Sequence, residues 1–203
     1  MSTTTTAPYT PTFLNEASMA KFSTTRYDRM IETGLLTSED KVELLENYVV
    51  LKMPRNPVHD STIQLLTRAL FRAIPAGWDL RCQLTIAVAD SRPEPDFIIV
   101  RGDARNYLAH HPTPADVGLL IEVANTSLLR DQRDKGRIYA RANIVCYWIV
   151  NLDDRRIEVH TQPSGPCDAP AYASVKNCAP GDAVPLVLDG TTVATIPVSD
   201  LLP

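Results

Sequence analysis

The chain has 203 residues, of which 44% are hydrophobic and 22% charged, so it can bury a core without help from disulfides or a structural metal. Its formal net charge of −4 excludes a protein coated in basic charge to grip nucleic acid, although a local basic groove stays compatible with it. The four cysteines share no C-x-x-C spacing and no nearby histidine in zinc-finger register, which predicts reduced thiols in a cytoplasmic protein rather than a zinc site.

The N-terminus is rich in threonine and has neither a basic start nor an apolar stretch over Met1–Pro8. We therefore expect neither a signal peptide nor a membrane anchor. No later run approaches the roughly 18 apolar residues that a membrane span needs. We expect residues 1–20 to form a disordered tail and residues 21–203 to form one domain.

The first half of the chain predicts two helices and two strand regions. A short helix is expected over Thr24–Thr33, ended by Gly34, and a strand or short hairpin over Val42–Met53. Apolar residues spaced by three and four predict an amphipathic helix over Val58–Ala73. Alternating residues then predict a strand over Trp78–Val88.

The second half predicts strands on both sides of a third helix. Apolar runs predict strands over Asp96–Val100 and Gly118–Ala124, followed by a helix over Ser127–Ala142. Later strands are expected at Cys146–Val150 and Arg156–His160, as a hairpin, and at Val184–Leu188 and Val193–Ile196, as edge strands. This order of elements predicts an α/β or α+β fold layered around a mixed sheet.

Two acidic residues lie in the apolar runs. Glu122 falls near the end of Gly118–Ala124, where an isolated carboxylate loses its hydration at a cost of several kcal/mol unless a partner or metal offsets it. If the two strands pair antiparallel with Val100 opposite Gly118, Asp96 lies opposite Glu122, with Cβ atoms about 5 Å apart. Such carboxylates repel unless one is protonated or a cation lies between them, and hard oxygen ligands suit Mg²⁺ or Mn²⁺.

A lysine and an acid share the apolar face of the next helix. Spacings of three and four place Asp131 and Lys135 on one stripe with Leu128 and Ile138, which must face the sheet. A lysine on such a stripe needs an acidic neighbour or must extend its amine to solvent. Because the helix follows the strand that carries Glu122, we expect Lys135 to reach the two acids. Asp131, four residues earlier, is a second partner for it.

Each feature also has an ordinary structural interpretation. Asp96 after Pro95 is typical of a turn residue at a strand edge, and Glu122 could be the partner of a buried arginine. Lys135 and Asp131 would form a surface pair if the helix were rotated. Chance explains the joint occurrence of these features less easily than any one of them.

Other polar residues are less specific. Thr126 or Ser127 is expected to cap the helix, with a role at the site as the alternative. His59 opens a helix, where a structural role is the simpler interpretation. Arginines along the third helix predict either a solvated face or contact with a polyanion; they are Arg130, Arg133, Arg137 and Arg141.

A series of short segments stands in a specific order within residues 24–160: Val42-Glu43-Leu44-Leu45-Glu46, His59, Glu94-Pro95-Asp96, Leu120-Ile121-Glu122-Val123-Ala124-Asn125-Thr126-Ser127, Lys135, Tyr139-Ala140-Arg141-Ala142 and Tyr147-Trp148-Ile149-Val150. This ordered set resembles the Uma-two family of restriction-endonuclease-like proteins, a bacterial branch of the PD-(D/E)xK nuclease superfamily. A lone Pro-Asp would carry little weight, but the whole series is specific.

The resemblance implies a restriction-endonuclease-like core, with a central mixed sheet flanked by helices and extra C-terminal strands. It implies that a divalent metal is held by Asp96, Glu122, the Val123 carbonyl and Glu46. The superfamily places a lysine two residues after the second acid, where this chain has Ala124, and the family supplies the amine from the following helix, where Lys135 stands. Asn47 stands where the family usually has glycine. Secondary candidates for the site are Ser127, Asp131, Tyr139 and His59.

These observations favour an Mg²⁺- or Mn²⁺-dependent endonuclease that hydrolyses DNA, with Asp96, Glu122 and Lys135 as catalytic residues. Arg130, Arg133 and Arg137 are then the candidate DNA contacts, and fold analogy suggests a homodimer. The alternative is a catalytically silent member of the fold that binds nucleic acid or a protein partner. A hydrolase of small phosphate esters is a third interpretation.

Overall fold

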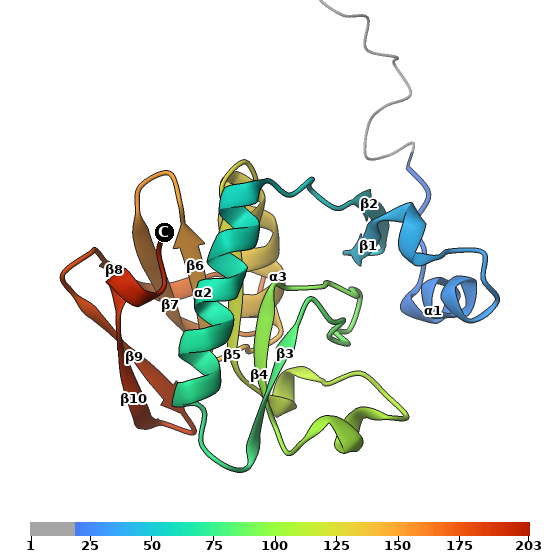
Figure 1. Cartoon of the computed structure of the whole chain (residues 1–203). Helices are drawn as coiled ribbons and strands as arrows, with labels where there is room; N and C mark the ends of the chain where they lie inside the picture. The colour runs from blue at the N-terminus through green and yellow to red at the C-terminus, as the bar shows by residue number, and fades with distance from the viewer. Residues whose placement is uncertain (1–18) are drawn as a thin grey trace, which may run out of the picture.

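The computed structural model describes residues 19–203, which form a mixed α/β fold around a six-stranded sheet (Figure 1). The strand order is β3-β4-β5-β6-β7-β8, with β5 and β6 parallel and every other neighbouring pair antiparallel. The expected fold class is therefore confirmed. Of the tail expected over residues 1–20, only residues 19 and 20 are among the described residues, and Met1–Pro8 lies wholly outside them.

The helices are α1 (Thr24–Glu32), α2 (Pro57–Ala73) and α3 (Gly136–Arg141). The strands are β1 (Val42–Leu45), β2 (Tyr48–Leu51), β3 (Trp78–Cys82), β4 (Phe97–Arg101), β5 (Val117–Ala124), β6 (Cys146–Asn151), β7 (Arg156–Pro163), β8 (Tyr172–Cys178), β9 (Ala183–Leu188) and β10 (Thr191–Pro197). Short 3-10 turns span Ser38–Asp40, Ala104–Tyr107, Pro114–Asp116 and Val198–Asp200. Within residues 19–203, none of the helices has the length and apolar character of a membrane span.

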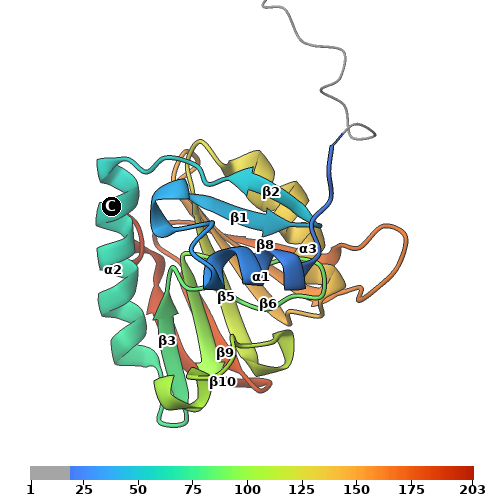
Figure 2. The same ribbon diagram turned by 90° about the vertical axis from the view of Figure 1, so that its right-hand side faces the viewer.

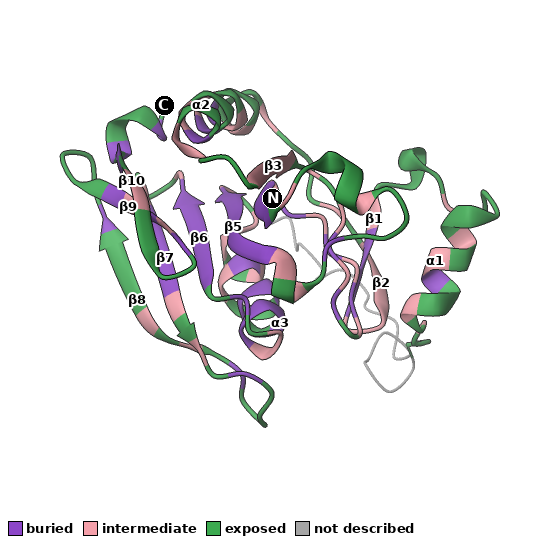
Figure 3. Cartoon of the chain, turned by 90° about the horizontal axis from the view of Figure 1, so that it is seen from below, coloured by how far each residue is buried: buried purple, intermediate pink, exposed green. Residues whose placement is uncertain are grey.

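The centre of the sheet is buried on both faces, as Figure 3 shows for β5 and β6. Alternate residues of these strands face two cores. One core packs Phe97 and Ile121 against Leu66 of α2, and the other packs Leu120 against Ile138 of α3. The two helices thus cover opposite faces of the sheet, which is why its central strands are apolar throughout.

Helix α2 begins as the sequence predicts. The Asn56 side chain accepts a hydrogen bond from the His59 N–H at 2.9 Å, and Pro57 occupies the first turn. The helix ends at Ala73. In Figure 2 it stands at one side of the sheet, and the loop that follows β2 leads into its N-terminal end. Its N-terminal end therefore sits at the edge of the site described below.

The C-terminal region differs from the sequence prediction. The strands expected at Val184–Leu188 and Val193–Ile196 form, but they pair with each other as the β9–β10 hairpin and pack with α2 rather than extending the main sheet. The edge strand of the sheet on that side is β8, which the sequence does not predict because its region is rich in turn residues; the opposite edge is β3. The strand predicted over Trp78–Val88 ends at Cys82, before Gln83 with φ of +54°.

The β4–β5 register is close to the predicted one. Phe97 pairs with Ile121, Ile98 with Leu120 and Ile99 with Leu119. A bulge then sets Val100 opposite Val117 instead of Gly118, so that part of the prediction is wrong. The predicted register holds at the other end of the strands, next to the two acids.

Candidate active site

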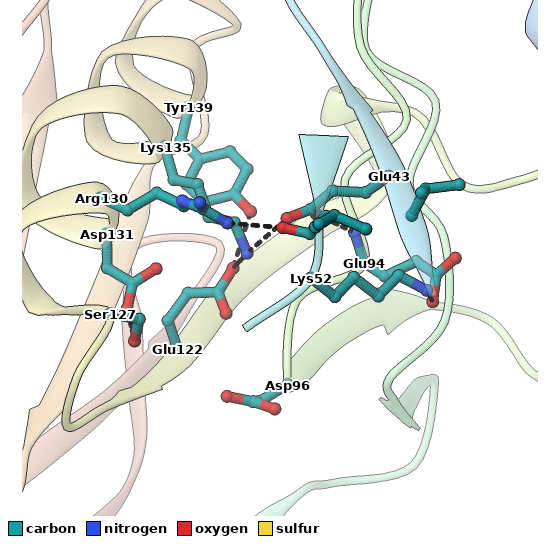
Figure 4. A network of polar contacts seen from close by, with 12 residues as sticks. Glu43, Lys52, Glu94, Asp96, Glu122, Ser127, Arg130, Asp131, Lys135 and Tyr139 are labelled. Atoms are coloured by element: carbon teal, nitrogen blue, oxygen red, sulfur yellow. Dashed lines mark hydrogen bonds and ion pairs between the residues drawn. The ribbon is translucent and has the colours of Figure 1, made fainter. Parts of the chain in front are cut away.

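A cavity of about 90 Å³ opens between the start of α2, the end of β5, the β1–β2 hairpin and the segment before α3. Figure 4 shows that Glu43, Glu122 and Lys135 point toward one another there. Acidic side chains line it from several elements: Glu43, Glu94, Asp96, Glu122 and Asp131. Basic side chains also line it: Lys52, Arg55, His59, Arg130 and Lys135. The structure thus brings Asp96, Glu122 and Lys135 to one place, as predicted from the sequence.

The Lys135 amine lies between two buried acids. Its Nζ is 2.9 Å from Glu122 Oε1 and 3.6 Å from Glu43 Oε1, and all three side chains are almost inaccessible to solvent. Tyr139 donates a second hydrogen bond to Glu122 Oε1 at 2.9 Å. Burial raises the pKa of the Tyr139 hydroxyl far above its usual value, so it remains a donor. These contacts fix the position of the Glu122 carboxylate.

The segment that carries Lys135 is wound more loosely than an α-helix. Residues Arg130–Lys135 form π-helical turns, whose wider hydrogen-bond spacing replaces part of the α-helix predicted over Ser127–Ala142. The Asp131 carbonyl accepts the π-helical hydrogen bond from the Gly136 N–H and a second one from the Tyr147 hydroxyl at 3.1 Å. The predicted stripe still faces the sheet, because Asp131, Lys135 and Ile138 are all buried.

Asp96 is held just before β4 by donors from three elements. Its Oδ2 accepts from the Val123 N–H at 2.8 Å and lies 3.3 Å from His59 Nε2, while Oδ1 accepts from Gln83 at 3.3 Å. Burial alone would raise the pKa of Asp96, but the hydrogen bond and charge of His59 and the Val123 N–H bring it below its usual value. Asp96 thus remains ionised inside the cavity.

Two buried acids near Lys135, Glu122 and Asp131, are pushed toward their neutral forms. Burial raises the pKa of Glu122 well above its usual value, although the Lys135 charge opposes this shift. Burial likewise raises the pKa of Asp131 to about 6, and neighbouring acids add to the effect. The pKa of Lys135 is raised, because the surrounding carboxylates outweigh its burial. Three buried acids, Glu43, Glu122 and Asp131, thus act on one buried ammonium group.

The structure does not bring Glu46 into this group. Glu46 and Asn47 form the two-residue turn of the β1–β2 hairpin, with φ of +49° and +68°, a conformation that asparagine tolerates. The Glu46 carboxylate is bound by Arg137 and Arg141, away from the cavity. Glu43, three residues earlier, instead points into the site, where it also accepts from the Glu94 N–H at 3.2 Å.

A sequence profile of the Uma2 family, described as "Putative restriction endonuclease", matches residues 25–197. The chain belongs to the Uma2 family. Among solved structures, it is similar to one described as "a putative nuclease belonging to DUF820" from Anabaena variabilis, with 14% identity and a TM-score of 0.64. The match covers 85% of this chain and 96% of that one, and at this identity it shows the fold alone. No curated protein matches the chain.

In this Uma2 chain the secondary candidates divide by position. Ser127, His59 and Asp131 line the cavity, whereas Tyr139 acts behind it through Glu122. The Ser127 hydroxyl donates to Asp131 Oδ2 at 2.6 Å, so Asp131 pairs with Ser127 rather than directly with Lys135. The His59 Nδ1 atom is buried without a hydrogen bond and lies 3.7 Å from Asp60.

The arginines predicted to contact a polyanion also differ in their positions and partners. Arg130 lines the cavity and donates to the Leu51 carbonyl at 2.8 Å, and Arg133 is exposed. Arg137 pairs with Glu46, which neutralises it. Arg55, which the sequence did not single out, lines the cavity and is exposed. Its signal was weak because it lies in the loop before α2, where no periodic pattern marks a face.

Proposed function

We propose that this restriction-endonuclease-like chain is a divalent-metal-dependent nuclease that hydrolyses phosphodiester bonds of DNA. The observation that carries the proposal is the Lys135 amine 2.9 Å from Glu122 in a cavity that also contains Asp96. Two acids and one amine in this arrangement provide a place for a cation and a fixed positive charge for a phosphate.

The residues present fit Mg²⁺ or Mn²⁺ through few protein ligands. Among residues 19–203, no three His, Cys, Asp or Glu side chains are grouped as a complete metal centre. Lys135 lies between Glu122 and Glu43, and His59 contacts Asp96. Mg²⁺ commonly keeps several waters and uses one or two carboxylates. A cavity of about 90 Å³ suits such a hydrated ion.

We assign Asp96, Glu122 and the Val123 carbonyl as ligands. Oxygen donors match the chemistry of these cations. Burial is the main cause of the raised pKa of Glu122, and the charges of Asp131, Asp96 and Glu43 add to it, so a bound cation would favour the carboxylate form. When bound, a divalent cation supplies charge neutralisation at the phosphate and acidifies a water. Glu46 is left out of this set because two arginines bind it.

The remaining groups act around this centre. Lys135 places its ammonium where it stabilises negative charge on a phosphate oxygen, while it also holds Glu122 in position. Tyr139 is a positioning residue, because it touches Glu122 and not the cavity. His59 keeps Asp96 oriented and ionised.

Arginines at the cavity supply contacts to the DNA backbone. Arg55 and Arg130 line the mouth, and the structure gives neither of them an acidic partner within residues 19–203. Each phosphate contact adds about 0.9 to the slope of log K against log salt on duplex DNA. We expect Arg55→Ala or Arg130→Ala to lower that slope by about 1. The control is Arg68→Ala, an exposed residue on α2 outside this cavity.

The decisive experiment is cleavage of a supercoiled plasmid in Mg²⁺ or Mn²⁺, since only an endonuclease opens a closed circle. We expect Asp96→Asn and Lys135→Met to lose cleavage by more than about a hundredfold, because each removes a fixed charge from the centre. The matched control is Lys176→Met, an exposed lysine on β8. Retained cleavage in both site variants would remove the proposed centre.

Calorimetric titration with Mn²⁺ separates the proposal from a catalytically silent interpretation, in which the chain only binds nucleic acid or a protein. We expect wild type to bind Mn²⁺ and Asp96→Asn to bind it at least about tenfold more weakly, because one anionic ligand is lost. A wild-type protein that neither binds Mn²⁺ nor cleaves DNA would favour the silent interpretation. Cleavage of a generic phosphate ester without DNA cleavage would favour a small-molecule hydrolase.

A further inference from the structure

Strand β3 is an edge of the main sheet. It pairs with β4 on one side, and no strand among residues 19–203 pairs with its other side. Its five residues are partly to fully accessible, in contrast to the buried strands at the centre of the sheet. An uncovered edge is a template for another strand, and natural proteins usually block such edges.

The charges of β3 are complementary to those of a second copy. Asp79 and Arg81 stand two residues apart with Leu80 between them. If two copies pair antiparallel about a two-fold axis at Leu80, Asp79 of each copy lies opposite Arg81 of the other. Opposite charges that face each other across strands stabilise the pairing, and like charges oppose it.

This complementarity also selects the register. A shift of two residues in one direction sets Asp79 against Asp79 of the second copy, and a shift in the other direction sets Arg81 against Arg81. A shift of one residue would put the α2 layers of the two copies on opposite faces. The opposite edge strand, β8, carries Lys176 as its single charged residue and has no such pattern.

The local environment of these charges supports a partner across the edge. Among the described residues the Asp79 side chain makes no hydrogen bond or ion pair, and Arg81 has no acidic partner. The Arg81 guanidinium lies 5.2 Å from the centre of the Tyr107 ring, which holds it on that face of β3. No acidic side chain among residues 19–203 forms an ion pair with Arg81, and a carboxylate from a second copy would give its guanidinium a charged partner.

An apolar groove runs beside the same edge. Between α2 and β3 it has a volume of about 390 Å³ and is lined by Phe71, Ile74, Trp78 and Leu80 among others. Phe71 is 78% exposed, so its ring adds apolar surface beside the groove. In the two-fold arrangement both α2 helices lie on the same side of the joined sheet, so the two grooves adjoin.

We propose that two copies of this chain associate through their β3 strands, with Asp79 of one copy paired to Arg81 of the other. The joined sheet would be continuous, and Phe71 of each copy would cover apolar surface beside the edge. The surface lies outside the candidate active site, so the proposal does not depend on nuclease activity.

Charge reversal tests the pairing by analytical ultracentrifugation of the full chain. We expect Asp79→Arg and Arg81→Asp each to weaken self-association at least about tenfold, because each places like charges across the edge. Mixed together, the two variants should form a heterodimer, since both cross-strand pairs are then opposite in sign. The double variant D79R/R81D should associate like wild type.

A second test uses cysteine cross-linking and does not depend on how Arg81→Asp folds. In a background with Cys82 and Cys167 changed to serine, Leu80→Cys should give a disulfide-linked dimer on mild oxidation, because the two residues face each other. Val175→Cys at the exposed middle of β8 is the matched control and should remain monomeric.

Three results would overturn the proposal. Wild type could remain monomeric at about 0.5 mM, where even a millimolar interface is partly occupied. A wild-type dimer could be unaffected by Asp79→Arg. The Val175→Cys control could cross-link as readily as Leu80→Cys.

Discussion

Removing the buried ammonium group should reveal how strongly the site depends on it. In Lys135→Met the side chain keeps its approximate length but loses its contacts at 2.9 Å to Glu122 and 3.6 Å to Glu43. Breaking a buried ion pair by removing one partner typically costs about 3–5 kcal/mol. Tyr139 still donates to Glu122, and the acids can take up protons, so we expect a loss of about 2–4 kcal/mol near neutral pH.

The loss should depend on pH in a defined direction. The Lys135 charge lowers the pKa of Glu122 against the effect of burial, so its removal raises that pKa further. A carboxyl group whose pKa is higher in the folded state than in the unfolded state stabilises the fold below the unfolded-state pKa. This stabilisation is lost as the pH rises through the folded-state pKa. The difference between wild type and variant should therefore be small at about pH 5 and largest at about pH 8.

Urea unfolding at both pH values measures this difference, and thermal unfolding provides a second measure. For a chain of this size, 1 kcal/mol corresponds to about 2–4 °C in Tm, so a loss near 3 kcal/mol should lower Tm by about 6–12 °C. Lys176→Met on the exposed β8 edge should change stability by less than about 0.5 kcal/mol. An equal loss at both pH values, or none, would show that Lys135 does not hold the two acids.

Three further predictions concern neighbouring groups. Asp131→Asn should become more stable relative to wild type as the pH rises from about 4 to 6, by up to about 3 kcal/mol, because burial raises the pKa of Asp131 to about 6; a flat difference in urea unfolding would contradict this. His59→Ala should cost about 1–2 kcal/mol at about pH 6 and less at about pH 9. The hydrogen bond and charge of Asp96 outweigh burial and raise the pKa of His59, so the stabilisation from this contact fades as the pH rises above that pKa. Gly118→Ala should lower stability by about 1–3 kcal/mol in thermal unfolding, since an added Cβ would lie 2.6 Å from the Trp78 ring; an unchanged Tm would mean that the ring moves aside without cost.

The sequence by itself determined the elements whose patterns are local. Helical spacing identified α2, and continuous apolar runs identified β4 and β5 as buried strands. The same spacing placed Lys135 on the buried face of its helix, because a residue three positions before Ile138 must share that face. These inferences held because periodicity records which side of an element faces the core.

Tertiary structure alone decided which acids meet. Glu43 and Glu46 lie three residues apart in an acidic, apolar segment, and only the hairpin turn at Glu46 sends one toward Lys135 and the other toward Arg137. The donors around Asp96 come from β5 and from residues 59 and 83, which no short-range pattern could bring together.

The same reason explains the strand that was missed and the helix that changed its winding. Strand β8 exists because β7 offers it a partner, while its own sequence alternates weakly among turn residues. The π-helical turns at Arg130–Lys135 coincide with a long-range hydrogen bond from Tyr147 to the Asp131 carbonyl. Local patterns fix the faces of elements, whereas contacts between distant segments fix turns, pairing partners and the final set of charges in the cavity.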